Sequence, residues 1–200
     1  MKLTVGTDST WSLRVWICSQ LAQIAVDVNV IDLTDSDYKS EILKHSETGL
    51  VPCLNEGTFV IHDSLAIMEY FNECSAGAIF PSSSAERALA RSLCSELHAG
   101  FISLRIQCPF SLEQVPALLE FNKDIENELR RITKIFGSAH LPFMFDSAGA
   151  VDAFYAILAF RLKAYGINLQ GKAGMYQESL LNWSTLKQAI KLAHHWKTHK

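Results

Sequence analysis

The pattern of apolar residues changes character near residue 75 of this 200-residue chain. Before that point, short runs with the two-residue alternation of strands are interspersed with helical spacing; after it, every apolar pattern has helical spacing. Residues 77–83 are rich in serine and contain glycine and proline, which is typical of a linker. We therefore expect a mixed α/β domain over residues 1–76 and an all-helical domain over residues 84–200.

The first domain is predicted to begin with a strand, a helix and a second strand. A short strand ends at Gly6, and a polar turn leads into apolar residues at helical spacing from Leu13 to Ile24. Alternating valines over residues 26–30 indicate the second strand. A crossover of this kind usually joins two parallel strands.

The rest of the first domain is predicted as a short helix, a hairpin and a third long helix. Residues 35–45 are polar with one apolar side, which favours a short or irregular helix. Residues 51–61 are typical of a hairpin with Gly57 in its turn. Asp63 is a good N-cap for a helix that would run from Ser64 to about residue 74.

The second domain is predicted to contain helices only. Leucines at helical spacing indicate one long helix that stops before Pro109. Pro116 suits the first turn of the next helix, which Gly137 would end. Residues 151–165 are apolar on nearly all sides, as a buried central helix would be, and two shorter helices would fill residues 175–196.

Charge and cysteine content exclude several classes of protein. The net charge is only −3, so nucleic acid is not an expected partner. The five cysteines include no C-x-x-C pair, so neither a disulfide framework nor a structural zinc site is expected. The start has no secretory signal, and no apolar run is long enough to span a bilayer. We expect a cytoplasmic protein with no membrane partner and no metal; His194, His195 and His199 would belong to a solvated basic tail.

Several motifs, in the right order, resemble segments of the glutathione-transferase superfamily. They are G-L-V-P-C-L at residues 49–54, D-S-L-A-I-M-E-Y at 63–70, F-P at 80–81 with E-R-A at 86–88, and P-F-M-F at 142–145 followed by V-D-A-F-Y at 151–155. The turn at residues 9–15 resembles that of serine-type members, notably the zeta class and related bacterial transferases. The resemblance spans roughly residues 1–165. It implies a thioredoxin-like domain joined to a helical bundle, in a homodimeric enzyme.

The resemblance further implies that glutathione is the cosubstrate and that its thiol is conjugated to a small electrophile. A free thiol has a pKa of about 8.5, so little thiolate exists at neutral pH. A helix N-terminus and a hydroxyl donor in the same turn would stabilise the thiolate. Ser9 is the first candidate for this donor, and Thr10 and Ser12 are the alternatives. Ser9 and Thr10 could instead only cap the first helix.

Two further segments would bind glutathione by the same resemblance. The proline that matches Pro52 is cis in the family, which would turn the backbone N–H and C=O of Val51 toward the tripeptide; an ordinary proline at a strand start is the alternative. The N–H and hydroxyl of Ser64 would suit the γ-glutamyl carboxylate, and Asp63 its ammonium group. Both residues could equally serve only to begin a helix.

Two positions depart from the family's pattern. Leu50 stands where many members have a lysine near the glycine carboxylate of glutathione. Gly149 replaces the usual hydroxyl cap before the central helix, so Asp152 would bond only to the backbone of Gly149.

The second substrate is expected to contact the helical domain. His98, Phe101 and Arg105 would share one face of the long helix, where Arg105 could orient an anionic cosubstrate; surface or interface roles are the alternative. Trp11 could stack on a ligand or serve in packing. The zeta-like turn also allows glutathione-dependent isomerisation of a small dicarboxylate, as in maleylacetoacetate isomerases. The missing lysine at position 50 keeps a non-catalytic binding protein open.

Overall fold

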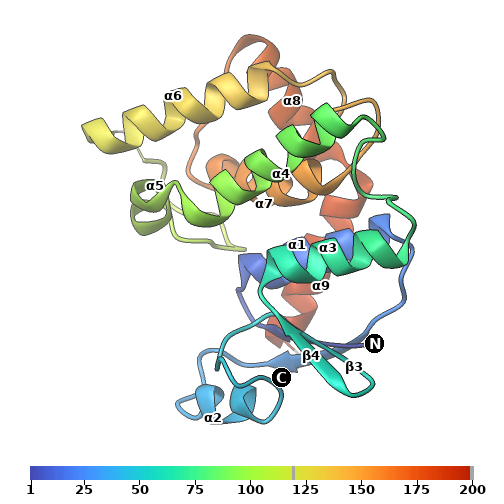
Figure 1. The fold of residues 1–200 in the computed structure, drawn as a ribbon. Helices are drawn as coiled ribbons and strands as arrows, with labels where there is room; N and C mark the ends of the chain where they lie inside the picture. The colour runs from blue at the N-terminus through green and yellow to red at the C-terminus, as the bar shows by residue number, and fades with distance from the viewer. Residues whose placement is uncertain (119, 199–200) are drawn as a thin grey trace. The chain divides into compact units, whose positions relative to one another are not determined.

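The computed structural model describes residues 1–118 and 120–198, which form two compact units (Figure 1). The first unit contains Met1–Ile79 together with the chain from Gln188 onward. The second contains Phe80–Lys187. The domain boundaries expected from the sequence remain a prediction. Among the described residues, no helix combines the length and the apolar character needed to cross a membrane.

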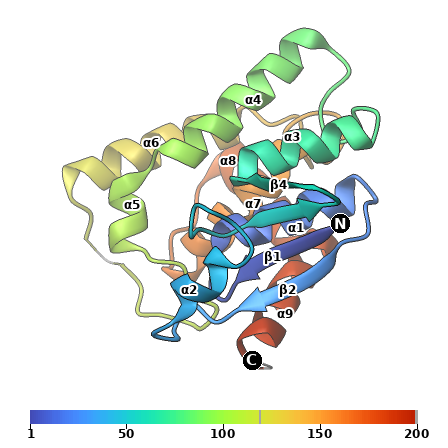
Figure 2. The same ribbon diagram turned by 60° about the horizontal axis from the view of Figure 1, so that its bottom comes forward.

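A four-stranded mixed sheet forms the centre of the first unit (Figure 2). Its strands are β1 (Lys2–Gly6), β2 (Asp27–Ile31), β3 (Cys53–Glu56) and β4 (Phe59–His62). The order is β2-β1-β3-β4; β1 runs parallel to β2, and β3 runs antiparallel to both β1 and β4. The predicted β-α-β start and the hairpin are confirmed.

Three helices accompany the sheet, and the chain order agrees with the sequence-based prediction. They are α1 (Thr10–Leu21), α2 (Tyr38–Leu43) and α3 (Ser64–Cys74). Helices α1 and α3 contact each other, and each contacts a strand of the sheet. The core includes Leu3, Leu13, Leu54, Ile67 and Phe71, all with at most 1% of their surface exposed. Burial of each such side chain contributes about 1.5–3 kcal/mol to folding. The first unit thus has the predicted thioredoxin-like arrangement.

The second unit is a helical bundle around one buried helix. Its helices are α4 (Ser84–Ala99), α5 (Ile102–Gln107), α6 (Lys123–Gly137), α7 (Ala150–Ala164) and α8 (Gly171–Asn182), and α9 (Ser184–Thr198) begins at its end. Twelve of the fifteen residues of α7 are buried, and α4 and α8 both contact it. The predicted buried central helix is therefore confirmed.

The single long helix predicted to run up to Pro109 is wrong, because the chain breaks after Ala99. Gly100 is extended, and Phe101 adopts a left-handed conformation with φ of 56°. A second helix, α5, then starts at Ile102, where the carboxylate of Glu128 accepts hydrogen bonds from the backbone N–H groups of Ser103 and Leu104. This cap comes from a distant helix, so local periodicity could not reveal the break.

The predicted helix start at Pro116 is also wrong, since α6 begins at Lys123 with Asn122 as its N-cap. The segment before it is held by hydrogen bonds to helix α7 instead of forming its own helix. The N–H of Leu118 donates to the carbonyl of Tyr165 at 3.1 Å, and the hydroxyl of Tyr165 donates to the carbonyl of Pro109 at 2.9 Å. Tertiary contacts therefore replace the helical bonds that the proline pattern suggested.

Candidate functional site

The turn between β1 and α1 is tied to the end of strand β2. The N–H of Thr7 donates to the carbonyl of Ile31 at 3.0 Å, and the N–H of Leu33 donates to the hydroxyl of Thr7 at 3.0 Å. A Cβ atom on Gly6 would lie 2.6 Å from the Leu33 side chain and 2.9 Å from that of Val51. Only glycine fits this close approach, which fixes where the turn leaves the sheet.

Ser9 is the N-cap of α1 and the end of a chain of hydrogen bonds. Its Oγ accepts from the N–H of Ser12 at 3.3 Å and from the hydroxyl of Ser12 at 3.0 Å. The hydroxyl of Ser12 in turn accepts from the N–H of Gly6 at 3.2 Å. The proton of Ser12 is therefore committed to Ser9, whereas the hydroxyl proton of Ser9 has no acceptor among the described residues.

Accessibility separates the three candidate hydroxyls of the turn. Ser9 retains 8% of its surface, Thr10 2% and Ser12 none. The Oγ1 atom of Thr10 is enclosed and has no hydrogen-bond partner in the described part of the chain. Ser9 alone combines a proton that is free to donate with residual access, and it lies at a helix N-terminus, where the potential favours an anion.

Helix α1 also carries Trp11, which contacts another side chain of the helix, and Cys18, which is buried. The guanidinium carbon of Arg14 lies 5.4 Å from the centre of the Trp11 ring, so Trp11 contributes to a cation–π contact. Cys18 is fully buried, and burial raises the pKa of its thiol, so a thiolate at this position is disfavoured at neutral pH. Cys18 therefore does not offer a reactive thiol at this turn.

The segment before β3 lies next to the β1–α1 turn. The peptide bond between Val51 and Pro52 is cis, as the resemblance implies. Pairing of Thr4 with Cys53 sets this segment beside the end of β1, and the Val51 side chain lies close to Gly6. The backbone N–H and C=O of Val51 make no hydrogen bond with any other described residue. The structure therefore brings Val51 and Ser9 to one edge of the sheet.

Asp63 and Ser64 form the start of helix α3, as predicted. Asp63 has a φ of 76°, and its Oδ1 accepts from the N–H of Leu65 at 2.8 Å. Ser64 is fully buried. Their helix packs against α1, whose cap is Ser9. The N-termini of both helices thus belong to the same unit.

The predicted shared face of His98, Phe101 and Arg105 is wrong, because the helix breaks between them. The guanidinium group of Arg105 donates to the carbonyls of Leu97 and His98, the second at 3.0 Å, and so closes the end of α4. Partial burial lowers the pKa of Arg105. These contacts support a structural role for Arg105 at a helix C-terminus.

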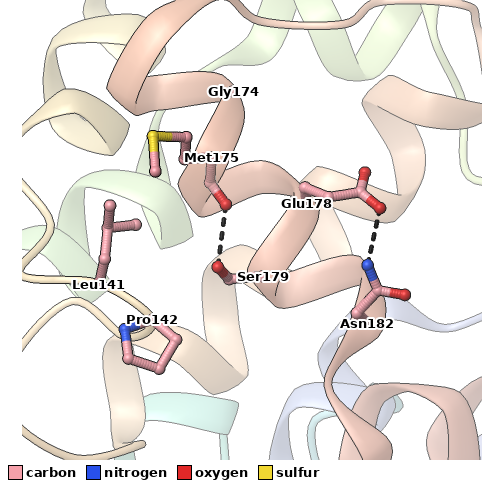
Figure 3. Close-up of a pocket in the computed structure, with 7 residues that line it drawn as sticks. All are labelled: Leu141, Pro142, Gly174, Met175, Glu178, Ser179 and Asn182. Atoms are coloured by element: carbon pink, nitrogen blue, oxygen red, sulfur yellow. Dashed lines mark hydrogen bonds between the residues drawn. The ribbon is translucent and has the colours of Figure 1, made fainter.

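A pocket of about 740 Å³ lies in the second unit, between α8 and the loop before α7 (Figure 3). Its lining residues are Leu141, Pro142, Gly174, Met175, Glu178, Ser179 and Asn182. Two polar groups are bonded within α8: the hydroxyl of Ser179 to the carbonyl of Met175, and the amide of Asn182 to Glu178. None of the predicted site residues lies in this pocket, which presents a mainly apolar surface.

One contact of the site was not expected from the sequence. The ammonium group of Lys197, in the last turn of α9, lies 3.1 Å from a carboxylate oxygen of Asp8, immediately before Ser9. No pattern in the sequence links two residues 189 positions apart. Among the described residues, no cluster of three or more His, Cys, Asp or Glu could hold a metal ion; His199 lies outside them.

Comparisons with known proteins identify the fold of the chain. Residues 8–74 match the family described as glutathione S-transferase, N-terminal domain. A glutathione transferase homolog from Burkholderia, with bound glutathione, is 22% identical with a TM-score of 0.73, covering 97% of both chains. The holo structure of maleylpyruvate isomerase, a bacterial zeta-class glutathione S-transferase, is 15% identical with a TM-score of 0.72, covering 96% of this chain and 98% of the other.

Poplar glutathione transferase F1 is 16% identical with a TM-score of 0.76, covering 97% of this chain and 98% of the other. The comparison with curated protein sequences finds no match. The structural likenesses extend over both units, and the sequence match covers most of the first. The chain therefore has the glutathione S-transferase fold, and its residues 8–74 are a glutathione S-transferase N-terminal domain.

Proposed function

We propose that the protein is a glutathione transferase in which the hydroxyl of Ser9 stabilises the thiolate of bound glutathione. The observation that carries this proposal is the hydrogen-bond chain from Gly6 through Ser12 to Ser9. Each hydroxyl in such a chain polarises the next, which strengthens the last donor. The hydroxyl of Ser12 already donates its hydrogen bond to Ser9, and the Oγ1 of Thr10 is enclosed. These contacts support Ser9 as our choice among the three hydroxyls that the sequence left open.

The proposed reaction needs no nucleophile from the protein. The thiol of glutathione loses its proton to water, and the helix N-terminus and Ser9 hold the resulting thiolate. The sulfur then attacks the electrophilic carbon and forms a C–S bond. A leaving group departs with its electron pair, or an unsaturated acceptor takes up a proton. Acceleration comes from the lowered thiol pKa and from proximity of the two substrates.

The rest of glutathione would contact two further segments. The unpaired backbone N–H and C=O of Val51 suit the peptide backbone of the ligand, beside Pro52. The N-terminus of α3 at Asp63 and Ser64 suits the carboxylate and ammonium of the γ-glutamyl end. Glutathione bound in the Burkholderia homolog supports this cosubstrate. By the same likeness, we propose a cytoplasmic homodimer that acts on a small electrophile.

No contact among the described residues favours the alternative function, glutathione-dependent isomerisation of a small dicarboxylate. It relied on Arg105 to orient a dicarboxylate, and this guanidinium group is bonded to two backbone carbonyls. A non-catalytic binding protein is the other alternative. Leu50, which has 68% of its surface exposed, provides no charge for the glycine carboxylate of glutathione. Affinity for glutathione therefore has to come from Val51 and the start of α3.

Calorimetric titration with reduced glutathione tests the proposal. We expect binding by the wild type and weaker binding by Ser64→Ala and Asp63→Ala. Ser184→Ala is the matched control, since Ser184 is the exposed first residue of α9. A turnover assay with aryl halides and unsaturated carbonyl compounds follows. Binding without turnover of any electrophile would favour the non-catalytic alternative, and no binding would exclude a glutathione transferase.

A further inference from the structure

The last turn of α9 supplies a cation to the turn that holds Ser9. The Nζ atom of Lys197 lies 3.1 Å from Oδ2 and 3.5 Å from Oδ1 of Asp8. Asp8 directly precedes Ser9 and has a left-handed φ of 56°. The two side chains are 40% and 33% exposed, so the pair is partly accessible to water. An ion pair between opposite ends of the chain thus adjoins the hydroxyl proposed to hold the thiolate.

Packing of α9, rather than the ion pair, keeps Lys197 in place. Ala189, Ala193 and Trp196 recur at helical spacing and are at most 3% exposed. Both ribbon views draw the last turns of α9, in red, beside the sheet (Figures 1 and 2). A partly exposed ion pair contributes little to stability, typically below about 1 kcal/mol. The charge of Lys197 is therefore held near Asp8 by a rigid support.

A carboxylate next to a thiolate opposes ionisation of the thiol, because a like charge disfavours the charged form. We propose that Lys197 is a positioning residue for the thiolate: its ammonium group neutralises Asp8, so that the negative charge beside Ser9 does not oppose ionisation of the thiol. This inference rests on the proposed function, since the thiol in question is that of glutathione. Ionisation of the thiol beside Ser9 would then depend on Lys197, in the last turn of α9.

Other charged groups surround the turn and stay unchanged in the variants below. Arg14 of α1 lies over Trp11. Asp32, which follows β2, accepts a hydrogen bond from the hydroxyl of Thr7 at 3.4 Å. Asp63 begins α3. Because these groups are common to every variant, differences between variants report Asp8 and Lys197 alone.

The sign of each effect separates this proposal from a purely structural role. If charge balance matters, Lys197→Met raises the thiol pKa and Asp8→Asn lowers it, and the double variant returns close to the wild type. If the pair only holds the turn in shape, both single variants break the same contact and shift the pKa in the same direction. Because the pair is partly accessible to water, which weakens the Coulomb interaction, we expect about a two- to five-fold change in thiolate fraction at a pH below the pKa. High salt should reduce the change.

A reporter thiol tests the charge balance without glutathione. Ser9→Cys places a thiol at the cap, and Cys74→Ser removes the exposed native cysteine; the other four are buried. The pH dependence of alkylation by iodoacetamide gives the reporter pKa, before and after adding Lys197→Met or Asp8→Asn. Lys191→Met, an exposed lysine on the same helix, is the matched control and should leave the pKa unchanged.

The same two substitutions are then made in the chain that keeps Ser9 and Cys74. The pKa of the bound glutathione thiol is measured from the ultraviolet absorbance of the thiolate at saturating glutathione. Opposite shifts with Lys197→Met and Asp8→Asn, in both experiments, are the expected result. Shifts of the same sign, or none, with glutathione bound would overturn this inference and leave the proposed function intact. Failure of the wild type to bind glutathione would overturn the proposed function and, with it, the assignment of Lys197 to that thiol.

Discussion

Helices α1 and α7 both begin at a buried polar side chain, Ser9 for α1 and Asp152 for α7. We call the start of α7 closed, because Asp152 is hydrogen-bonded within the fold, and the start of α1 open, because Ser9 can still donate a hydrogen bond. At α7, the carboxylate of Asp152 accepts from the N–H of Met144 and of Gly149, each at 2.9 Å, and from the hydroxyl of Tyr176 at 2.7 Å. At α1, the chain of hydrogen bonds ends on Ser9 with a proton left to donate. A closed start stabilises the fold, whereas an open one can bind a ligand.

The largest expected effect is on the closed start. Asp152→Ala would leave two buried donors and one partly buried donor without this acceptor, so we expect a loss of about 3 kcal/mol in the free energy of unfolding. Urea denaturation measures it. Asp146→Ala is the control, since that side chain is 96% exposed and should change stability very little. Equal stability of both variants would show that the start of α7 is not the support described here.

Next in size is the effect of Ser9→Ala on the open start. Loss of the thiolate donor should lower turnover about 10- to 100-fold, because the lost hydrogen bond lies on the reacting sulfur. The lost cap should cost about 1 kcal/mol of stability, and glutathione binding should weaken less than turnover. Steady-state kinetics measure the turnover, and calorimetric titration measures glutathione binding. A variant that keeps its turnover, with loss instead in Ser12→Ala, would move the donor within the turn.

The pH dependence of stability should reveal Asp152 as well. Burial raises the pKa of this carboxyl above its ordinary value, against the opposing hydrogen bonds. The folded state then binds the proton more tightly than the unfolded state. The free energy of unfolding should therefore fall as pH rises from the ordinary pKa through the raised one. In Asp152→Asn this component of the slope should vanish in denaturation series recorded at several pH values; an unchanged slope would contradict the assignment.

The smallest expected effect concerns Thr10, whose buried Oγ1 has no partner among the described residues. Thr10→Val keeps the shape and removes the unsatisfied hydroxyl. We expect the free energy of unfolding to rise by about 1 kcal/mol or less, because the penalty for burying an unpaired polar group disappears. Thermal unfolding measures it. A clear loss of stability would mean that the hydroxyl of Thr10 forms a stabilising hydrogen bond in the folded protein.

The first unit could be predicted from the sequence because its signals are local. The strand ending at Gly6, the hairpin and the cap at Asp63 each depend on a few adjacent residues. The breaks in the second unit depend on distant partners. Glu128 caps α5 from another helix, and Tyr165 holds the backbone at Leu118, so neither the break after Ala99 nor the late start of α6 leaves a periodic signal.

In the candidate site, too, features set by adjacent residues could be predicted, whereas features set by distant partners could not. Ser9, Val51 and Asp63 were found through motifs that lie within short segments. The sequence could not choose among Ser9, Thr10 and Ser12, because that choice depends on which hydroxyl already donates a hydrogen bond within the protein and which is enclosed. Asp152 was expected to bond only to Gly149, and the structure adds Met144 and Tyr176. Such partners are set by packing between elements.

The most direct test of the account is the pKa of the glutathione thiol on the protein, measured from thiolate absorbance at saturating ligand. We expect a value below that of free glutathione in the wild type and a return toward it in Ser9→Ala. Ser19→Ala removes another buried serine of α1, bonded to the carbonyl of Trp16, and should leave the thiol pKa unchanged. A thiol pKa in Ser9→Ala equal to that of the wild type would contradict the central claim.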